Sequence, residues 1–239
     1  MPVGNRIYTR RRLPERELIE AFEQLPCANV ADCMGRDCAM NPRIRLISRP
    51  KKEQTAGPAL TVKCRGGDNL MLHAAMELAQ EGDVVVVSND EDTNRSLIGE
   101  IMMTFLKVQK KIAAIVIDGP IRDMGELSQW ELPIYCTGST PGGPFKDGPG
   151  EVNTPIACGG VSVNPGDIIL CDADGVICIP RQDAKAILPA AQAYHEKDEQ
   201  KTKAAAGAPG EYKHDWVYKN LEAKGTEIID GVYGGESNW

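Results

Sequence analysis

The chain has 239 residues, enough to bury a substantial core, and its 42% hydrophobic and 26% charged residues are typical of a globular protein. The formal net charge of −7 disfavours nonspecific nucleic-acid binding, and no segment approaches the ~18 apolar residues that span a bilayer. No apolar segment follows the N-terminal arginines, so no secretory signal is predicted. We therefore expect a soluble, cytoplasmic protein with no nucleic-acid or membrane partner.

The basic residues and cysteines indicate no binding or redox site. The cluster Arg10-Arg11-Arg12 is interpreted as a solvated N-terminal arm. The eight cysteines are scattered without a CxxC pair, and several lie in apolar strand-like runs, which predicts buried free thiols. The three histidines lie apart from one another and from the cysteines, which disfavours a zinc site of the His/Cys type.

In the first part of the chain, apolar residues at helical spacing predict a helix from Pro14 to Leu25. A short second helix is predicted over residues 30–34. Residues 37–55 contain prolines and many charges, and they predict an irregular connection. Residues 57–64 contain β-branched residues and are bounded by glycines, which is typical of a strand.

The middle of the chain alternates helical and strand-like segments. Helices are predicted over residues 69–80, 96–110 and 123–130, and strands over 82–89, 112–118 and 132–136. Strands that alternate with helices in this way predict a parallel sheet with right-handed crossovers.

After residue 137 the chain is rich in Gly and Pro, and then residues 165–180 predict two strands around an Asp-Ala-Asp-Gly turn. A long helix is predicted over 181–206 and a shorter one over 212–223. We interpret residues 1–206 as a single α/β catalytic domain. The extension over 207–239 is expected to pack on that domain or on a neighbouring subunit.

The motif Ile-Asp-Gly-Pro-Ile-Arg-Asp over residues 117–123 ends an apolar strand and opens a helix. Ligands of open α/β sheets collect at the carboxyl ends of strands, so a site is expected here. Asp123 can ligate a hard cation such as Mg²⁺ or Mn²⁺ through oxygen, and Arg122 can clamp a carboxylate or a developing oxyanion. The alternative is that Asp123 only caps the helix and Arg122 is an ordinary surface residue.

A second candidate segment, residues 93–103, follows the preceding strand. If its helix begins near Ile98, the amides of Glu100, Ile101 and Met102 lack intrahelical partners and suit a substrate carboxylate. Glu100 can approach the same metal, or it is simply an acid favoured in a first helical turn. Together the residues at the two strand ends predict a site for a metal-chelating 2-oxo acid. The same combination of two acids, an arginine and free amides is also compatible with any Mg²⁺ enzyme.

The glycine-rich stretch over residues 65–70 is neither a dinucleotide fingerprint nor a P-loop. It is interpreted either as a close approach of backbone to the site or as a tight turn. His73, which follows it on a helix, is interpreted as a packed or surface residue rather than a catalytic one. There is no G-x-S-x-G element to support a serine hydrolase.

These motifs resemble the RraA-like (regulator of ribonuclease activity A-like) superfamily, and within it the class II 4-hydroxy-4-methyl-2-oxoglutarate / 4-carboxy-4-hydroxy-2-oxoadipate aldolases. The resemblance runs from about residue 20 to 205. It is carried by GPALTVKC, GGDNLMLHAAMELAQEGDVVVV, IGEIMM, AAIVIDGPIRD and GPGEVNTPIACGGVSVNPGDIILCDADGVICIP. The implied fold is an α/β, swivelling β/β/α-type sandwich with a parallel βαβαβ centre and a long C-terminal helix. The implied assembly is a homotrimer or homohexamer with the site between subunits.

The resemblance also implies roles for individual residues. Asp123 would ligate Mg²⁺ or Mn²⁺, and Glu100 would contact the metal through water. Substrate binding would involve Gly99, the amides of Ile101 and Met102, and Arg122, which would stabilise the enolate. Glu199 of a neighbouring subunit would also reach the metal through water, with Glu196 as the competing candidate. The implied reaction is retro-aldol cleavage to pyruvate, with oxaloacetate decarboxylation as a companion activity.

The sequence departs from the family pattern at two places. The connection between Glu100 and Arg122, which contains VQKK, is one residue longer than expected, and the tail beyond residue 207 is longer than in most relatives. A non-catalytic regulator that binds an RNA-degrading enzyme is the main alternative function, but retention of Glu100, Arg122 and Asp123 favours catalysis. A dedicated β-keto acid decarboxylase also stays open. A methyltransferase ranks last, because nothing resembles a nucleoside cofactor site.

Overall fold

The computed structural model describes residues 3–208 and 210–234. Compact packing divides the chain into two units, one ending at His195 and the other beginning at Glu196. Each is described by itself. The sequence-based domain boundary at residue 206 stays a prediction.

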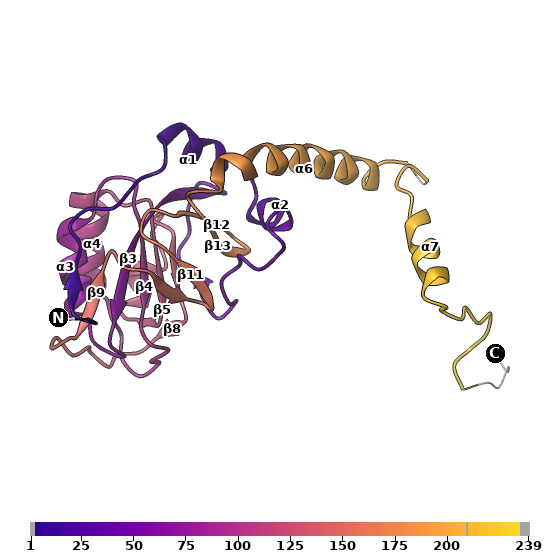
Figure 1. The fold of residues 1–239 in the computed structure, drawn as a ribbon. Helices are drawn as coiled ribbons and strands as arrows, with labels where there is room; N and C mark the ends of the chain where they lie inside the picture. Colours follow the sequence, from indigo (N-terminus) through magenta and orange to yellow (C-terminus); the bar gives the residue numbers. More distant parts are fainter. Residues whose placement is uncertain (1–2, 209, 235–239) are drawn as a thin grey trace. The chain divides into compact units, whose positions relative to one another are not determined.

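A nine-stranded sheet forms the centre of the first unit (Figure 1). Its path runs β1-β9-β3-β4-β5-β7-β2, and the hairpin β12-β13 joins it through β3. The strands are β1 (Arg6–Ile7), β2 (Arg45–Leu46), β3 (Thr55–Cys64), β4 (Val84–Ser88), β5 (Ala114–Asp118), β7 (Ile134–Cys136), β9 (Gly150–Val152), β12 (Ile168–Asp172) and β13 (Gly175–Ile179). Four of them, β3, β4, β5 and β7, run parallel in that order, which confirms the predicted parallel centre.

Strand β4 shows why the sheet is covered on both faces. Its four valines are all buried, as expected for a strand between two layers. Val85 and Val87 pack with the helices, whereas Val84 and Val86 pack with the second β layer, following the two-residue period of a strand. The predicted β/β/α-type sandwich is therefore confirmed.

The helix layer is built from α3 (Leu70–Leu78), α4 (Glu100–Phe105) and α5 (Met124–Leu127), which connect the parallel strands. The other face carries the hairpin β10 (Ile156–Cys158) and β11 (Val161–Val163) and the paired strands β12 and β13. A small parallel pair, β6 (Pro120–Ile121) and β8 (Gly138–Ser139), lies just beyond the end of β5. Helices α1 (Arg16–Phe22) and α2 (Cys27–Asp32) pack on β12 and β13.

Several predicted boundaries were wrong. The second helix begins at Cys27 rather than Val30, because Pro26 has extended φ and ψ and occupies the N-cap instead of only ending the first helix. Residues 37–55 are not wholly irregular, since they contain β2, which pairs with β7. Helix α4 begins at Glu100, two residues later than Ile98, and continues into a π-helical turn over Leu106–Lys110.

The N-terminal basic cluster also differs from its prediction as a solvated arm. The Arg11 side chain is only 5% exposed and forms an ion pair with the buried carboxylate of Asp83. Tertiary pairing with Asp83 therefore removes one arginine of the cluster from water. The prediction for the cysteines is confirmed, because all eight are free thiols and all but Cys33 are buried. Burial raises the pKa of Cys136 to about 11 and that of Cys64 to about 12.

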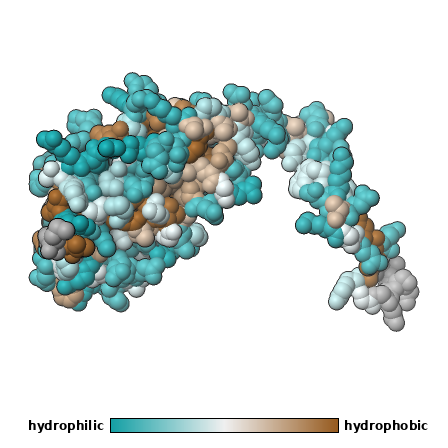
Figure 2. Space-filling model, in the orientation of Figure 1, coloured by the Kyte–Doolittle hydropathy of each residue, from teal (hydrophilic) through white to brown (hydrophobic). Residues whose placement is uncertain are grey.

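Both predicted C-terminal helices are present, as α6 (Ala184–Ala205) and α7 (Asp215–Ala223). The surface of the second unit is mostly hydrophilic, with apolar residues towards the end of the chain (Figure 2). Within the described part of the chain, no helix combines the length and apolar character needed to cross a membrane.

Candidate active site

The site is built where two segments that follow neighbouring strands lie side by side. The Leu97 amide donates to Pro120 O at 3.1 Å, and the Arg122 amide donates to Ile98 O at 3.0 Å. These two hydrogen bonds hold the segment before α4 against the segment after β5. The carboxyl ends of two parallel strands thereby present one continuous surface, as predicted from their order in the sheet.

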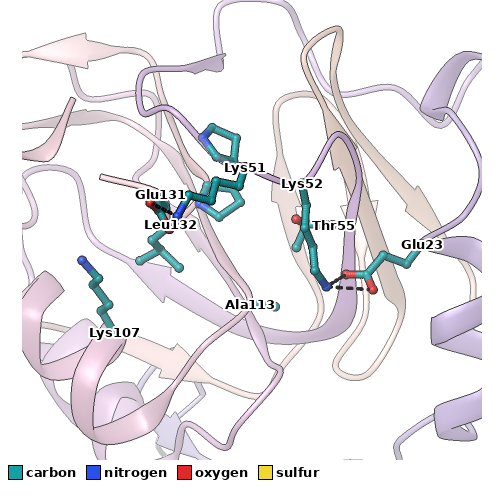
Figure 3. A pocket seen from close by; sticks show the side chains of 10 residues that line it. Glu23, Lys51, Lys52, Thr55, Lys107, Ala113, Glu131 and Leu132 are labelled. Atoms are coloured by element: carbon teal, nitrogen blue, oxygen red, sulfur yellow. Dashed lines mark hydrogen bonds and ion pairs between the residues drawn. The ribbon is translucent and has the colours of Figure 1, made fainter. Parts of the chain in front are cut away.

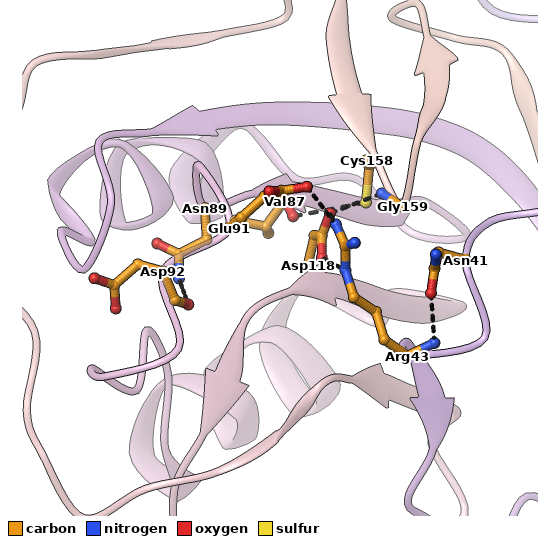
Figure 4. Close-up of polar contacts among 9 residues, drawn as sticks. All are labelled: Asn41, Arg43, Val87, Asn89, Glu91, Asp92, Asp118, Cys158 and Gly159. Atoms are coloured by element: carbon orange, nitrogen blue, oxygen red, sulfur yellow. Dashed lines mark hydrogen bonds and ion pairs between the residues drawn. The ribbon is translucent and has the colours of Figure 1, made fainter.

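Asp118 ends β5 and is held by Arg43 and Gly159 (Figure 4). Its buried carboxylate accepts hydrogen bonds from Arg43 Nε at 2.9 Å and Arg43 Nη2 at 2.8 Å, and from the Gly159 amide at 2.8 Å. Arg43 Nη2 also contacts Glu91 Oε1 at 3.0 Å, so Arg43 links the ends of β4 and β5. These hydrogen bonds, chiefly that of Asp118, raise the pKa of Arg43. Sequence reasoning did not identify Arg43.

Asp123 has the N-cap position of α5, yet its side chain makes no capping hydrogen bond to that helix. Its backbone is left-handed, with φ 61°, a conformation that Asp tolerates better than most residues. Oδ2 instead accepts a hydrogen bond from the Glu100 amide at 2.9 Å. The Arg122 Nε lies 3.7 Å from the same oxygen. The simple capping alternative therefore does not describe this carboxylate.

Gly99 is required by this close approach. A Cβ on Gly99 would lie 2.4 Å from Asp123 Oδ2 and 2.9 Å from Arg122 Nε. Its φ of −137° is ordinary, so space rather than conformation demands glycine. Gly99 thus lets the backbone before α4 touch both candidate catalytic side chains.

The start of α4 offers fewer free amides than the sequence predicted. The Glu100 amide is engaged by Asp123, and the first intrahelical bond runs from the Met103 amide to Gly99 O at 3.1 Å. The amides of Ile101 and Met102 lie between these two. An anionic group placed there would meet two donors and the positive end of the helix.

A pocket of about 370 Å³ opens beside this helix start. The predicted substrate-binding residues Gly99, Ile101, Met102 and Arg122 all line it. Asp123 lines a second pocket of about 380 Å³, which shares Arg122 with the first. Arg122 therefore stands between the two spaces, with 47% of its side chain exposed.

The first pocket is also lined by residues that were not predicted as site residues, among them Asn69, His73 and Lys146. Asn69 is 2% exposed; its Nδ2 donates to Leu97 O at 2.8 Å, and its Oδ1 has no hydrogen-bond partner. Burial, and then the charge of Lys146, lower the pKa of His73. Asn69 lies within the glycine-rich stretch over residues 65–70, whose approach to the site was one of the two interpretations above.

The loop that carries Lys146 is held against α3 by Asp68. Its carboxylate accepts hydrogen bonds from the amides of Leu70 at 2.9 Å, Asp147 at 2.7 Å and Gly148 at 2.9 Å. Burial opposes ionisation of Asp68, but these bonds outweigh it and lower its pKa. Asp68 therefore brings together two segments that the sequence separates by almost 80 residues.

The residues present fit a hard cation that keeps most of its water. Over residues 3–208 and 210–234 no group of three or more His, Cys, Asp or Glu side chains could hold a metal ion. Mg²⁺, however, commonly binds through one or two carboxylates, waters and substrate oxygens. Asp123 supplies one carboxylate that is 42% exposed. The amide that donates to this carboxylate belongs to Glu100, whose own side chain is exposed. Glu199 lies on α6 in the second unit, and its role in a neighbouring site stays a prediction, as does that of Glu196.

A further pocket of about 330 Å³ lies at the amino ends of the parallel strands (Figure 3). Its charged side chains neutralise one another: Lys51 contacts Glu131 at 2.7 Å, and Lys52 contacts Glu23 at 3.0 Å. Lys107 lies over the Trp130 ring at 4.1 Å. Paired surface charges of this kind are ordinary, so we assign this pocket no role.

The chain is similar to proteins named as putative aldolases and to a solved structure from an RNase inhibitor family. A protein of Halalkalibacterium halodurans named "Putative 4-hydroxy-4-methyl-2-oxoglutarate aldolase" is 35% identical over 190 residues, which cover 80% of this chain and 89% of that protein. A Bacillus cereus protein of the same name is 35% identical over 127 residues, covering 53% and 79%. The solved structure of Streptomyces coelicolor RraAS2, described as an unusual member of the RNase ES inhibitor RraA protein family, matches with a TM-score of 0.70 and 26% identity, covering 80% of this chain and 98% of that one.

The family model described as "RraA-like: Aldolase/RraA" matches residues 27–178. This range contains β3 to β12, β13 except its last residue, and every residue of the site described above except those on α6. The chain belongs to the RraA-like family.

Proposed function

We propose that this protein is a divalent-metal-dependent carbon–carbon lyase that cleaves a 4-hydroxy-2-oxo acid to pyruvate by a retro-aldol reaction. The observation that carries the proposal is the contact between Asp123 Oδ2 and the Glu100 amide, which joins an acid, an arginine and a helix start beside one pocket. The aldolase names of the relatives agree with this arrangement.

Substrate orientation follows from the donors around the first pocket. The carboxylate next to the 2-oxo group binds the amides of Ile101 and Met102 at the start of α4. Arg122, at the boundary of both pockets, directs its guanidinium to the 2-oxo oxygen, where negative charge develops as the C3–C4 bond breaks. A planar fork of N–H donors suits an enolate oxygen next to a carboxylate.

Asp123 would hold Mg²⁺ or Mn²⁺, assisted through water by Glu100 and by Glu199 of a neighbouring subunit. When bound, the ion supplies a Lewis acid that withdraws electrons from the 2-oxo acid. The Glu100 amide orients the Asp123 carboxylate by donating a hydrogen bond to it. No lysine Schiff base is required in this scheme.

Other residues that line this pocket suit the remaining groups of a dicarboxylic substrate. Lys146 supplies a positive charge for the second carboxylate, and the partly buried His73 lies beside it. Asn69 Oδ1, buried and without a partner, can accept a hydrogen bond from the 4-hydroxyl group. Oxaloacetate, which has a second carboxylate but no hydroxyl, would be decarboxylated as a companion substrate. A homotrimer or homohexamer would complete the site with its neighbour's glutamate.

The test is pyruvate release from 4-hydroxy-4-methyl-2-oxoglutarate and from oxaloacetate, with Mg²⁺ or with EDTA, after subtraction of the metal-only rate. We expect metal-dependent release that is lost in Asp123→Ala and retained in Asp37→Ala, an exposed aspartate far from the site in sequence. Release that persists in Asp123→Ala would refute Asp123 as the ligand.

A second candidate function is regulation of an RNA-degrading enzyme without catalysis. It is favoured by the structural match to a member of an RNase inhibitor family. Catalysis is favoured instead by the contacts among Glu100, Arg122 and Asp123: Asp123 Oδ2 accepts from the Glu100 amide and lies 3.7 Å from Arg122 Nε. If neither substrate turns over, a pull-down with the full chain distinguishes a regulator from a lyase of another substrate.

A further inference from the structure

A pocket of about 470 Å³ lies at the outer edge of the central sheet, beside the N-terminal segment. Arg6, Tyr8 and Arg10 line one side of it. They alternate along a segment that begins as β1 and pairs with β9, where the Tyr8 amide donates to Val152 O at 3.1 Å. Alternate residues of an extended chain share a face, so all three side chains reach the same space.

This pocket is separate from the candidate active site. In the sheet, β1 and β9 lie on the β3 side, whereas Arg122 follows β5. The two pockets have no lining residue in common. A ligand here would therefore bind without displacing the 2-oxo acid.

Two buried polar residues on the other side of the pocket have unpaired atoms. Asn153 is 6% exposed; its amide donates to Thr61 O at 2.9 Å and its Nδ2 to Tyr8 O at 2.7 Å, but its Oδ1 has no partner. Thr154 is 5% exposed; its carbonyl accepts from Thr61 Oγ1 at 2.7 Å, but its own Oγ1 has no partner. The chain thus fixes both residues and leaves one acceptor and one hydroxyl unpaired.

The charge of the pocket is positive. Glu151 is neutralised by Arg6, whose Nε lies 2.6 Å from Glu151 Oε1, and by the Gly4 amide at 3.2 Å. Arg10 also lines the pocket, is exposed, and forms no ion pair within the described residues. One net guanidinium charge remains, in the planar form that binds phosphate or carboxylate through two parallel hydrogen bonds.

We propose that this pocket binds a small oxyanion that also carries a hydroxyl group. The oxyanion accepts hydrogen bonds from Arg10 and from the outer nitrogens of Arg6. The hydroxyl donates to Asn153 Oδ1, an atom that can only accept, and Thr154 Oγ1 pairs with the remaining oxygen. Phosphate and carboxylate share this chemistry, and a hydroxyl beside the charged group distinguishes the expected ligand from a simple inorganic anion.

Calorimetric titration of the full chain tests this at constant ionic strength, with glycerol 3-phosphate, glycerate and inorganic phosphate as probes. We expect saturable binding of one of the two hydroxylated probes, and at least tenfold weaker binding of inorganic phosphate. The hydroxylated probe that binds more tightly shows whether the pocket prefers a phosphate or a carboxylate group. Binding should weaken at least tenfold in Arg10→Gln and in Thr154→Val, and should be unchanged in the neighbouring control Arg12→Gln.

The Thr154→Val variant separates binding from folding. Because Thr154 Oγ1 makes no hydrogen bond, the isosteric valine should leave the melting temperature of the ligand-free protein unchanged or raise it. No saturable heat with any probe, or equal binding in wild type and Thr154→Val, would overturn the proposal. Binding that is lost in Arg122→Lys but kept in Arg10→Gln would also overturn it, since the probe would then occupy the candidate active site.

Discussion

The Glu100 amide donates a hydrogen bond of 2.9 Å to Asp123 Oδ2, joining residues that are 23 positions apart. The contact places the carboxylate at the positive end of α4 and not at the start of its own helix, α5. Asp123 therefore belongs to the start of α5, but its carboxylate is oriented by α4. Any change that separates these two helix starts should reduce turnover before it unfolds the protein.

Replacing Gly99 with alanine tests that contact directly. The new Cβ would lie 2.4 Å from Asp123 Oδ2, so the carboxylate and Arg122 must move. We expect kcat for pyruvate release to fall roughly 10²-fold, because small displacements of reacting groups have effects of that size. The loss of stability should be about 1–3 kcal/mol, as for other overpacked positions.

Gly125→Ala is the matched control for this substitution. Gly125 lies in α5, and a Cβ there meets nothing within 4 Å. Alanine should therefore raise stability by about 0.5–1 kcal/mol or leave it unchanged, with wild-type kinetics. Equal kinetics of the Gly99→Ala and Gly125→Ala variants would show that the close approach has no catalytic importance.

Arg122→Lys keeps the charge and removes the planar fork. If Arg122 stabilises the developing oxyanion, kcat should fall about 10²–10³-fold while the melting temperature changes little, because 47% of the side chain is exposed. Steady-state kinetics on oxaloacetate measure this effect. Wild-type kinetics in this variant would remove Arg122 from the mechanism.

His73 should titrate below its ordinary pKa of 6.5, because burial and then Lys146 disfavour its charged form. Between its lowered folded pKa and 6.5 the unfolded chain binds more protons. His73 therefore makes stability rise with pH across that interval and fall on acidification. Imidazole signals followed by NMR, and assigned with His73→Gln, report this pKa.

In Lys146→Gln the His73 pKa should move part of the way back towards 6.5, because burial remains as the larger cause. The same variant should raise KM for a dicarboxylic substrate, since it removes the positive charge of a residue that lines the pocket. Lys63→Gln, an exposed lysine that does not line this pocket, serves as the control for a general change in charge. An unchanged His73 titration would show that Lys146 points away from the pocket.

The ion pair of Arg43 and Asp118 should contribute to stability as well as to position. Arg43→Met leaves the Asp118 carboxylate buried without its two guanidinium hydrogen bonds. Because Arg43 is 37% exposed, we expect a loss of about 2–3 kcal/mol, below the ~3–5 kcal/mol of a fully buried pair. Adding Asp118→Asn to Arg43→Met should recover part of the melting temperature. If the melting temperature does not recover, the loss of stability in Arg43→Met comes from the lost packing of the arginine's aliphatic stem.

The sequence predicted the parts of the fold that have a long regular pattern. The valines of β4 and the helical spacing around α3 and α6 are local signals, and those elements were found within a few residues. Strands β1 and β9 were not predicted, because two or three residues carry no measurable period and depend on a partner strand. Arg11 was misplaced for a similar reason, since only its pairing with Asp83 reveals its burial.

The candidate site was predictable to the extent that its residues are adjacent in the chain. Arg122-Asp123 and the start of α4 could be identified because both follow strands that must be neighbours. Asn69 and Lys146 could not, since their common pocket depends on Asp68 holding a distant loop. The hydrogen bond from the Glu100 amide to Asp123 was also not predicted, because a carboxylate that accepts from a helix other than its own leaves no local signal in the sequence.

The π-helical turn over Leu106–Lys110 contains Val108, Gln109 and Lys110, within the stretch where this chain is one residue longer than its relatives are expected to be. A π-turn is how a helix accommodates a single inserted residue without breaking. Here the π-turn lies at the C-terminal end of the helix, a full turn and more beyond Glu100. A residue inserted or removed within 106–110 would therefore leave the Glu100 amide in register with Asp123.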